Sequence, residues 1–206
     1  MKFQIIAGEL CLDFINTVDN RLVPERRQDL VPSYADLLEW AVQAGALSAS
    51  QQRLLEREAL AHPSRASAVH ERSVTLRECL YRIATAIANH RRVAANDLGV
   101  LNTFLDEALA HLKLQPTQKG FRMHWPQSDL PLDFVWWPIV RSASELLTGD
   151  DLQYVRECGA GTCRWLFVDR SKNHSRRWCD MKICGNRIKA KKFYRRQGRV
   201  RTVRSR

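Results

Sequence analysis

The sequence predicts a mainly α-helical N-terminal domain with a small β-hairpin (an α+β fold), followed by a compact cysteine-rich module. Three observations support this division. Apolar residues recur at helical spacing over most of residues 1–150. They alternate with polar residues only near residue 120. Four of the six cysteines lie within 27 residues of one another in the last quarter of the chain.

Each helix is predicted from its apolar spacing and from residues that start or stop helices. An apolar run at 3–6 is expected to form a short strand, and the helical pattern begins directly after it. Ser33 is a candidate N-cap, Ser48 or Ser50 a second and Asn96 a third. In chain order, the expected helices cover residues 10–18, 34–44, from 48 or 50 to the residue before Pro63, 66–90, 96–112 and 134–147. Gly45 is expected to end the second of these helices and Gly149 the last.

The alternating segment predicts a β-hairpin. Leu112 and Leu114 alternate with polar neighbours, as do Phe121, Met123 and Trp125, and a turn-prone stretch at 116–120 separates them. We place a domain boundary near 149–151, so that residues 1–150 form the first domain and 151–206 the second. The long helix at 66–90 carries an apolar stripe that fits either an ordinary core helix or a homodimer interface.

Composition excludes several classes of protein. The chain has 206 residues, 45% hydrophobic and 27% charged, as in a soluble globular protein of one or two domains. No apolar run approaches the roughly 18 residues of a membrane helix, and the N-terminus does not resemble a secretory signal. Six cysteines in such a chain argue against a disulfide scaffold. We therefore expect a cytoplasmic protein without a membrane partner.

The excess positive charge is confined to the end of the chain. The net charge is +11. Residues 151–206 hold 17 lysines and arginines against four acidic residues, whereas residues 1–150 are close to neutral. The last 20 residues carry ten basic side chains and no acidic one. Such a block is typical of a polyanion-binding surface, and the alternative is a solvated tail without a specific partner.

The cysteine spacing predicts a metal site. Cys158 and Cys163 form one pair, Cys179 and Cys184 form another, each pair encloses four residues, and 15 residues separate the pairs. Two short loops that each present two thiolates suit one tetrahedral, structural Zn²⁺. We expect a treble-clef-like finger in which a knuckle, a hairpin and a second knuckle lead to a helix that carries the last ligand. Two disulfides or four unrelated thiols are the alternatives, and His174 is interpreted as a loop residue.

The remaining cysteines and the histidines suggest no further chemistry. Cys11 and Cys79 lie on apolar helical stripes and are interpreted as core thiols. Four thiolates leave no open position on zinc for a substrate, and no catalytic motif stands out elsewhere in the sequence. We therefore expect no enzymatic activity, with an unseen active site in the first domain as the alternative.

The helix after Cys184 is predicted to place basic residues on one face, with Ala190, Phe193 and Tyr194 packed against the finger on the other. Arg176 and Arg177 add charge from the loop before Cys179. About six phosphate contacts would give a slope near −5 for log affinity against log salt concentration, and the helix start is suited to reading base edges. The candidate nucleic-acid contacts are Arg176, Arg177, Asn186, Arg187, Lys189, Lys191, Lys192, Arg195, Arg196 and Arg199.

These residues resemble a known family. Cys163-Arg-Trp-Leu-Phe167, Arg176-Arg-Trp-Cys-Asp-Met181 and the Cys-Gly-Asn-Arg string at 184–187 resemble the CGNR zinc finger. The front of the chain, Leu10-Cys-Leu-Asp-Phe-Ile-Asn-Thr17, and Trp137-Pro-Ile-Val-Arg-Ser-Ala143 resemble the ABATE domain that precedes this finger. The resemblance implies a bacterial, stress-associated transcription regulator with a four-cysteine zinc site.

A regulator of this kind would also need a sensor. Asp13, Asn16 and Thr17 share a helix face with Arg21, and together with Trp136, Trp137 and Arg141 they are candidates for a small-molecule pocket. The simpler alternative is that Asp13 pairs with Arg141 to orient two helices. The function predicted is therefore zinc-dependent DNA binding and transcription control. The alternatives are an RNA-binding or ribosome-associated zinc protein and a module that binds other proteins.

Overall fold

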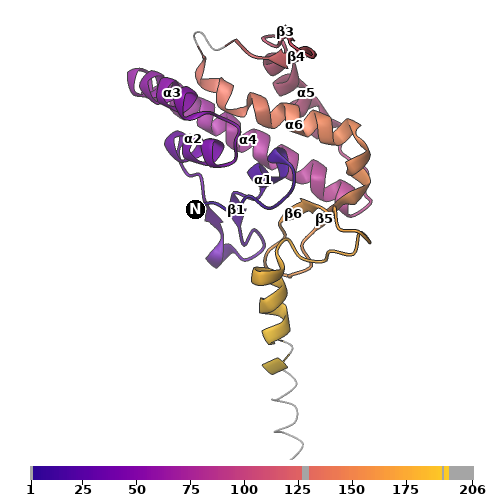
Figure 1. Ribbon diagram of the computed structural model, residues 1–206. Helices are drawn as coiled ribbons and strands as arrows, with labels where there is room; N and C mark the ends of the chain where they lie inside the picture. The colour runs from indigo at the N-terminus through magenta and orange to yellow at the C-terminus, as the bar shows by residue number, and fades with distance from the viewer. Residues whose placement is uncertain (1, 127–129, 192, 195–206) are drawn as a thin grey trace, which may run out of the picture.

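The fold is built around one long helix. The computed structural model describes residues 2–126, 130–191 and 193–194. Within these residues α4 crosses the molecule and packs against α1, α2, α3 and α5, while α6 covers α1 and α5 (Figure 1). The α-helices are α1 Leu10–Ile15, α2 Tyr34–Gln43, α3 Ala49–Ala61, α4 Pro63–Ala88, α5 Ala95–Leu109 and α6 Trp137–Thr148.

In the described part of the chain, the strands form three small antiparallel pairs. The pair β3–β4 is the predicted hairpin, with Leu114 opposite Met123 and a turn at 118–119, and it lies at the end of the molecule away from the C-terminal helix (Figure 1). The strands are β1 Val18–Asp19 with β2 Gln28–Asp29, β3 Lys113–Thr117 with β4 Gly120–His124, and β5 Val155–Glu157 with β6 Leu166–Val168.

The caps predicted for the early helices are present. The Ser33 hydroxyl accepts a hydrogen bond from the Asp36 amide at the start of α2. Ser48 and Gln51 form a reciprocal capping box at the start of α3, which selects Ser48 over Ser50. The cap predicted for Asn96 is wrong, because α5 begins at Ala95 and Ala94 occupies the N-cap position, two residues before Asn96. The structure instead ties the first turn of α5 to α4 through Asp97, which accepts two hydrogen bonds from Arg82.

Three other expected elements differ. The helix expected over 10–18 ends at Ile15, and Val18 lies in β1. Residues 3–6 do not form a strand, because side chains rather than a neighbouring strand satisfy their backbone: Gln43 bonds Phe3, and Asp13 bonds Ile6. The helix expected from residue 134 begins as a 3₁₀ turn, Leu132–Trp136, and becomes α6 at Trp137, where Pro138 fits the first turn. Gly149 ends α6 as predicted.

The apolar stripe of α4 belongs to the chain's own core. Leu76, Leu80 and Ile83 are at most 3% exposed, and α1 and α5 pack against this helix. These three side chains are therefore unavailable as a dimer interface. Cys11 and Cys79 are buried free thiols in the same core, as predicted. Among the residues that the structure describes, no helix has both the length and the apolar character needed to cross a bilayer.

The cysteine-rich module is docked on the first domain. Strand β6 packs against α1 and β5 against α4. The Asn16 side chain bonds both the amide and the carbonyl of Leu166, at 2.9 and 2.8 Å, as a neighbouring strand would. The Val168 amide donates to the Ala7 carbonyl, and the Trp165 indole donates to the Val18 carbonyl. One hydrophobic core therefore runs from the helices into the module.

Candidate metal centre and basic helix

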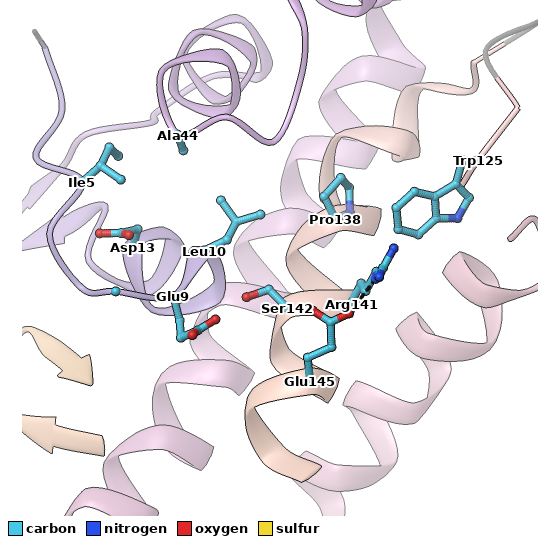
Figure 2. Close-up of a pocket in the computed structure, with 11 residues that line it drawn as sticks. Ile5, Glu9, Leu10, Asp13, Ala44, Trp125, Pro138, Arg141, Ser142 and Glu145 are labelled. Atoms are coloured by element: carbon cyan, nitrogen blue, oxygen red, sulfur yellow. Dashed lines mark hydrogen bonds and ion pairs between the residues drawn. The ribbon is translucent and has the colours of Figure 1, made fainter. Parts of the chain in front are cut away.

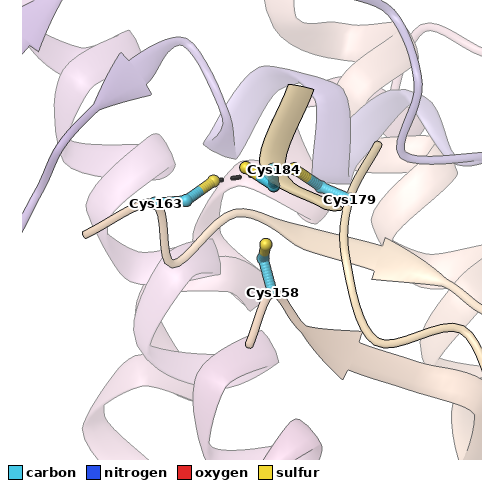
Figure 3. Close-up of side chains that lie close together, drawn as sticks. All are labelled: Cys158, Cys163, Cys179 and Cys184. Atoms are coloured by element: carbon cyan, nitrogen blue, oxygen red, sulfur yellow. Dashed lines mark hydrogen bonds between the residues drawn. The ribbon is translucent and has the colours of Figure 1, made fainter. Parts of the chain in front are cut away.

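Four cysteine side chains converge on one point below the helical domain. The sulfurs of Cys158, Cys163, Cys179 and Cys184 all lie within 4.8 Å of one another, and all four residues are buried (Figure 3). The Cys163–Cys179 and Cys179–Cys184 sulfur distances are both 3.6 Å. All four are free thiols, which excludes the alternative of two disulfides. The alternative of four unrelated thiols fails on the same distances.

The first pair lies in the connection between β5 and β6. Cys158 follows β5 directly, and its amide donates to the Trp165 carbonyl across the loop. The Cys163 amide donates to the Ala160 carbonyl, which closes the turn between the two ligands. The hairpin expected between the two cysteine pairs is therefore displaced: only β6 lies there, and its partner β5 precedes the first cysteine.

The second pair is held by the turn Met181–Gly185, which has the wider winding of a π-helix. Asp180 caps this turn, since its side chain accepts a hydrogen bond from the Ile183 amide at 2.8 Å. The Asp180 carbonyl accepts another from the Gly185 amide. A Cβ at Gly185 would lie 2.4 Å from the Met181 sulfur, so glycine lets Met181 fold across the turn. Cys184 is thereby fixed at the start of the helix that follows.

The local environment favours an ionised sulfur at Cys158 alone among the four cysteines, because the hydrogen bonds to Cys158 raise the pKa of Cys163 and Cys179. Thiol hydrogen bonds from Cys163 and Cys179, together with the Ala160 amide, lower the pKa of Cys158 far below its ordinary value. Burial raises the pKa of Cys184. A buried cluster of this kind cannot hold four negative charges without a cation at its centre. A divalent metal supplies the positive charge that balances these thiolates, and its binding deprotonates the coordinating thiols.

The donor set fits one structural Zn²⁺. Four thiolates at the usual Zn–S length of about 2.3 Å form a tetrahedron with edges of about 3.8 Å, close to the 3.6 Å distances observed. The coordination sphere is then complete, as in structural rather than catalytic zinc sites. His174 contributes no ligand, because its ring stacks on Tyr154 at 3.8 Å and bonds the Asp169 carbonyl.

The helix after Cys184 projects away from the body of the molecule (Figure 1). Residues 186–191 and 193–194 are helical, and Asn186, Arg187, Lys189 and Lys191 are exposed. The expected packing of this helix is wrong. Phe193 and Tyr194 are 57% and 70% exposed, and Ile188 is the residue that packs against the core. Lys192, Arg195, Arg196 and Arg199 lie outside the described residues.

The two arginines before Cys179 differ in their surroundings. Arg176 is half-buried over the Phe167 ring, and its guanidinium donates to the carbonyls of Trp178, Cys179 and Ile6. Its Nε and one terminal nitrogen are therefore engaged inside the protein, and its contact with nucleic acid stays a prediction. Arg177 is exposed beside the Trp178 ring and retains the role predicted for it as a candidate.

Sequence reasoning missed Asp169, which organises the loop before Cys179. Its buried carboxylate accepts hydrogen bonds from the amide and hydroxyl of Ser171 and from the Arg176 amide. Burial opposes ionisation of Asp169, but these hydrogen bonds outweigh it and hold its pKa below the ordinary value. The available signal was the Asp-x-Ser spacing, typical of a side chain that bonds its own backbone two residues on.

The residues predicted for a ligand pocket separate into two groups. Asn16 holds β6, Thr17 accepts a hydrogen bond from the buried Arg77, and Trp136 is fully buried against Phe104. Of the neighbours considered with them, Arg21 pairs with Glu78, and the buried Trp137 stacks on the exposed His111. Asp13 and Arg141 line one cavity, shown in Figure 2. They do not pair with each other, because Arg141 pairs with Glu145 and Asp13 bonds backbone amides.

Comparison with protein families assigns both parts of the chain. Residues 8–150 match the ABATE family, described as "Putative stress-induced transcription regulator". Residues 154–197 match the CGNR zinc finger, and this range contains all four clustered cysteines. A comparison with curated proteins finds no significant match. The chain therefore belongs to the ABATE family and carries a CGNR zinc finger at residues 154–197.

Proposed function

We propose that this zinc-binding regulator acts by binding double-stranded DNA through the helix that begins at Cys184, while residues 1–150 sense a small molecule. The observation that carries the proposal is the helix itself. Its described polar residues, Asn186, Arg187, Lys189 and Lys191, are all exposed. The metal ligand Cys184 and the half-buried Ile188 anchor it to the rest of the protein.

The charges suit a phosphate backbone. Arginine and lysine side chains that contact phosphates position a protein on the duplex and make its affinity strongly dependent on salt. Arg177 adds a cation close to the metal centre. Asn186 and Arg187 stand at the helix start, where side chains of suitable chemistry read adenine and guanine edges. The proposal assigns no catalytic step, because four thiolates leave zinc without an open position.

A binding titration with the full-length, zinc-loaded protein tests this function. Fluorescence anisotropy on a random-sequence duplex at several salt concentrations gives the affinity and its salt slope. The double variant Lys189→Gln/Lys191→Gln should lower the slope by about 2, since each phosphate contact contributes about 1. Lys119→Gln is the matched control, because Lys119 is exposed on the distant hairpin turn. Unchanged binding by the double variant would contradict the proposal.

A second candidate is binding of single-stranded RNA. The exposed rings of Phe193 and Tyr194 beside basic side chains favour it, because aromatic side chains stack on unpaired bases. Competition between duplex DNA and single-stranded RNA of equal length, at fixed salt, separates the two. Under the DNA proposal the duplex competes better, and Phe193→Ala/Tyr194→Ala leaves duplex affinity largely intact. Preferential RNA binding that the same double variant abolishes would instead establish the second candidate.

A further inference from the structure

A cavity of about 580 Å³ lies between the N-terminal segment, α1 and α6. This volume is in the range of small-molecule sites, roughly 300–1,000 Å³. Figure 2 shows Asp13 and Glu9 on one side, Arg141 and Trp125 on the other, and Leu10 between them. The cavity is distinct from the metal centre, whose cysteines do not line it.

Arg141 presents free donors at one end of the cavity. Its Nε donates to Glu145 at 2.7 Å, and within the described part of the chain its two terminal nitrogens have no partner. The guanidinium extends towards Trp125 (Figure 2). The Trp125 indole nitrogen already donates to the Ala108 carbonyl, so this side chain offers the cavity an apolar ring. A planar guanidinium with two free terminal nitrogens suits a carboxylate.

Asp13 presents a free acceptor at the other end. It is 5% exposed, and one carboxylate oxygen accepts hydrogen bonds from both the Ile6 and Ala7 amides, at 2.8 and 2.9 Å. The second oxygen has no partner among the residues described. A nearly buried carboxylate with an unused oxygen at a cavity wall suits an ammonium donor.

We propose that this cavity binds a small zwitterion of amino-acid or dipeptide size, with its carboxylate on Arg141, its ammonium on Asp13 and its apolar part against Leu10, Pro138 and Trp125. A simple anion would face the carboxylates of Glu9, Asp13 and Glu145. A simple cation would approach the Arg141 guanidinium. A neutral apolar ligand would cover both charged groups without pairing either, which costs free energy.

The cavity wall is also part of the contact with the finger. Gly8 and Glu9 line the cavity, and both accept hydrogen bonds from Arg170, which lies between the two cysteine pairs. A ligand that contacts Glu9 therefore touches the segment on which the finger is docked. This proposal deepens the sensing part of the proposed function, and only its link to nucleic-acid affinity rests on the proposed DNA binding.

Isothermal titration of the full-length, zinc-loaded protein tests the proposal without nucleic acid, so failure of DNA binding leaves this result unaffected. The probes are leucine, phenylalanine and the dipeptide leucyl-phenylalanine, together with the N-acetylated and C-amidated forms of the dipeptide. We expect a zwitterionic probe to bind at millimolar concentration or below. Removal of either terminal charge should weaken binding about tenfold or more. Comparison of the free amino acids with the dipeptide identifies the size class.

Arg141→Gln and Asp13→Asn should each weaken binding of the same probe about tenfold or more. Asparagine keeps the oxygen that bonds Ile6 and Ala7, so the fold is retained. Arg53→Gln, at an exposed position of α3 outside the cavity, should bind as the unmodified chain does. The proposal is overturned if no zwitterion binds at millimolar concentration. It is also overturned if the capped dipeptides bind equally well, or if the two cavity variants bind like the control.

Discussion

Among single residues, the buried Asp13 leads to a prediction of how the stability of the protein depends on pH. Burial raises its pKa to about 6 from an ordinary value of 3.8. Between these values the unfolded chain has lost the proton and the folded chain retains it. Stability therefore falls as pH rises through this window and is constant above it. The change from this one group is on the order of 3 kcal/mol.

The variant Asp13→Asn removes this titration and preserves both backbone hydrogen bonds. We expect the free energy of unfolding of the variant, relative to the unmodified chain, to increase between about pH 4 and pH 6. Urea unfolding at a series of pH values measures it. Because both proteins carry the same cysteines, effects of acid on the metal centre cancel in the difference. A constant difference across the series would contradict the assignment.

Arg176 and Arg177 are neighbours with different expected effects. Arg176→Gln removes hydrogen bonds to three backbone carbonyls, and we expect it to lower the free energy of unfolding by about 1–3 kcal/mol. Arg177→Gln alters an exposed side chain, and we expect unchanged stability but a salt slope for duplex binding smaller by about 1. Chemical denaturation and anisotropy measure the two effects. An exchange of these outcomes would reverse the roles given to the two residues.

The sequence could not distinguish these two arginines. The cysteine ligands were predictable because the residue type and the spacing that a zinc site requires are both visible in the sequence. The partners of Arg176 are main-chain carbonyls, one of them at Ile6. Every residue has such a carbonyl, so the sequence does not show which of them Arg176 bonds. The same limit applied to Asn16 and Thr17. Their polarity suggested a ligand pocket, but in the structure Asn16 bonds the finger and Thr17 bonds Arg77.

Among the elements, local sequence signals predicted the positions of the helices better than they predicted what the helices pack against. Ser33 and Ser48 mark helix starts because each bonds an amide three residues on, a purely local interaction. The packing of Phe193 and Tyr194 failed as a prediction because helical periodicity identifies a face but not its partner. In the structure Ile188, in the first turns, is within reach of the core, while Phe193 and Tyr194 lie beyond it.

The contact between β6 and α1 can be tested by substitution of Asn16. Asn16→Ala removes both hydrogen bonds to Leu166 and leaves two buried backbone groups unpaired. We expect a loss of about 2–4 kcal/mol in the free energy of unfolding, since each unpaired group costs about 1–3 kcal/mol. Denaturant unfolding measures the loss. Asn102→Ala is the control, because Asn102 is exposed on α5. Equal stability of the two variants would show that this contact does not hold the module.

At the scale of the whole molecule, the metal centre and the helical domain form one structure. Residues 1–150 and 151–206 differ in charge, and this difference predicts two separate domains. The buried cysteines nevertheless belong to the same hydrophobic core as the helices. The contacts that join them span about 150 residues of sequence, and no local pattern encodes such a contact. Loss of zinc should therefore weaken the packing of the finger on α1 as well as the finger itself.

We propose that zinc, held by four cysteines, positions a basic helix for binding DNA. The most direct test adds zinc stepwise to metal-free, reduced full-length protein while duplex binding is followed by anisotropy. We expect binding to rise with added zinc and to saturate at one equivalent per chain, and we expect Cys179→Ser to remove this response. Full duplex affinity in the metal-free protein, unchanged by zinc, would contradict the proposal.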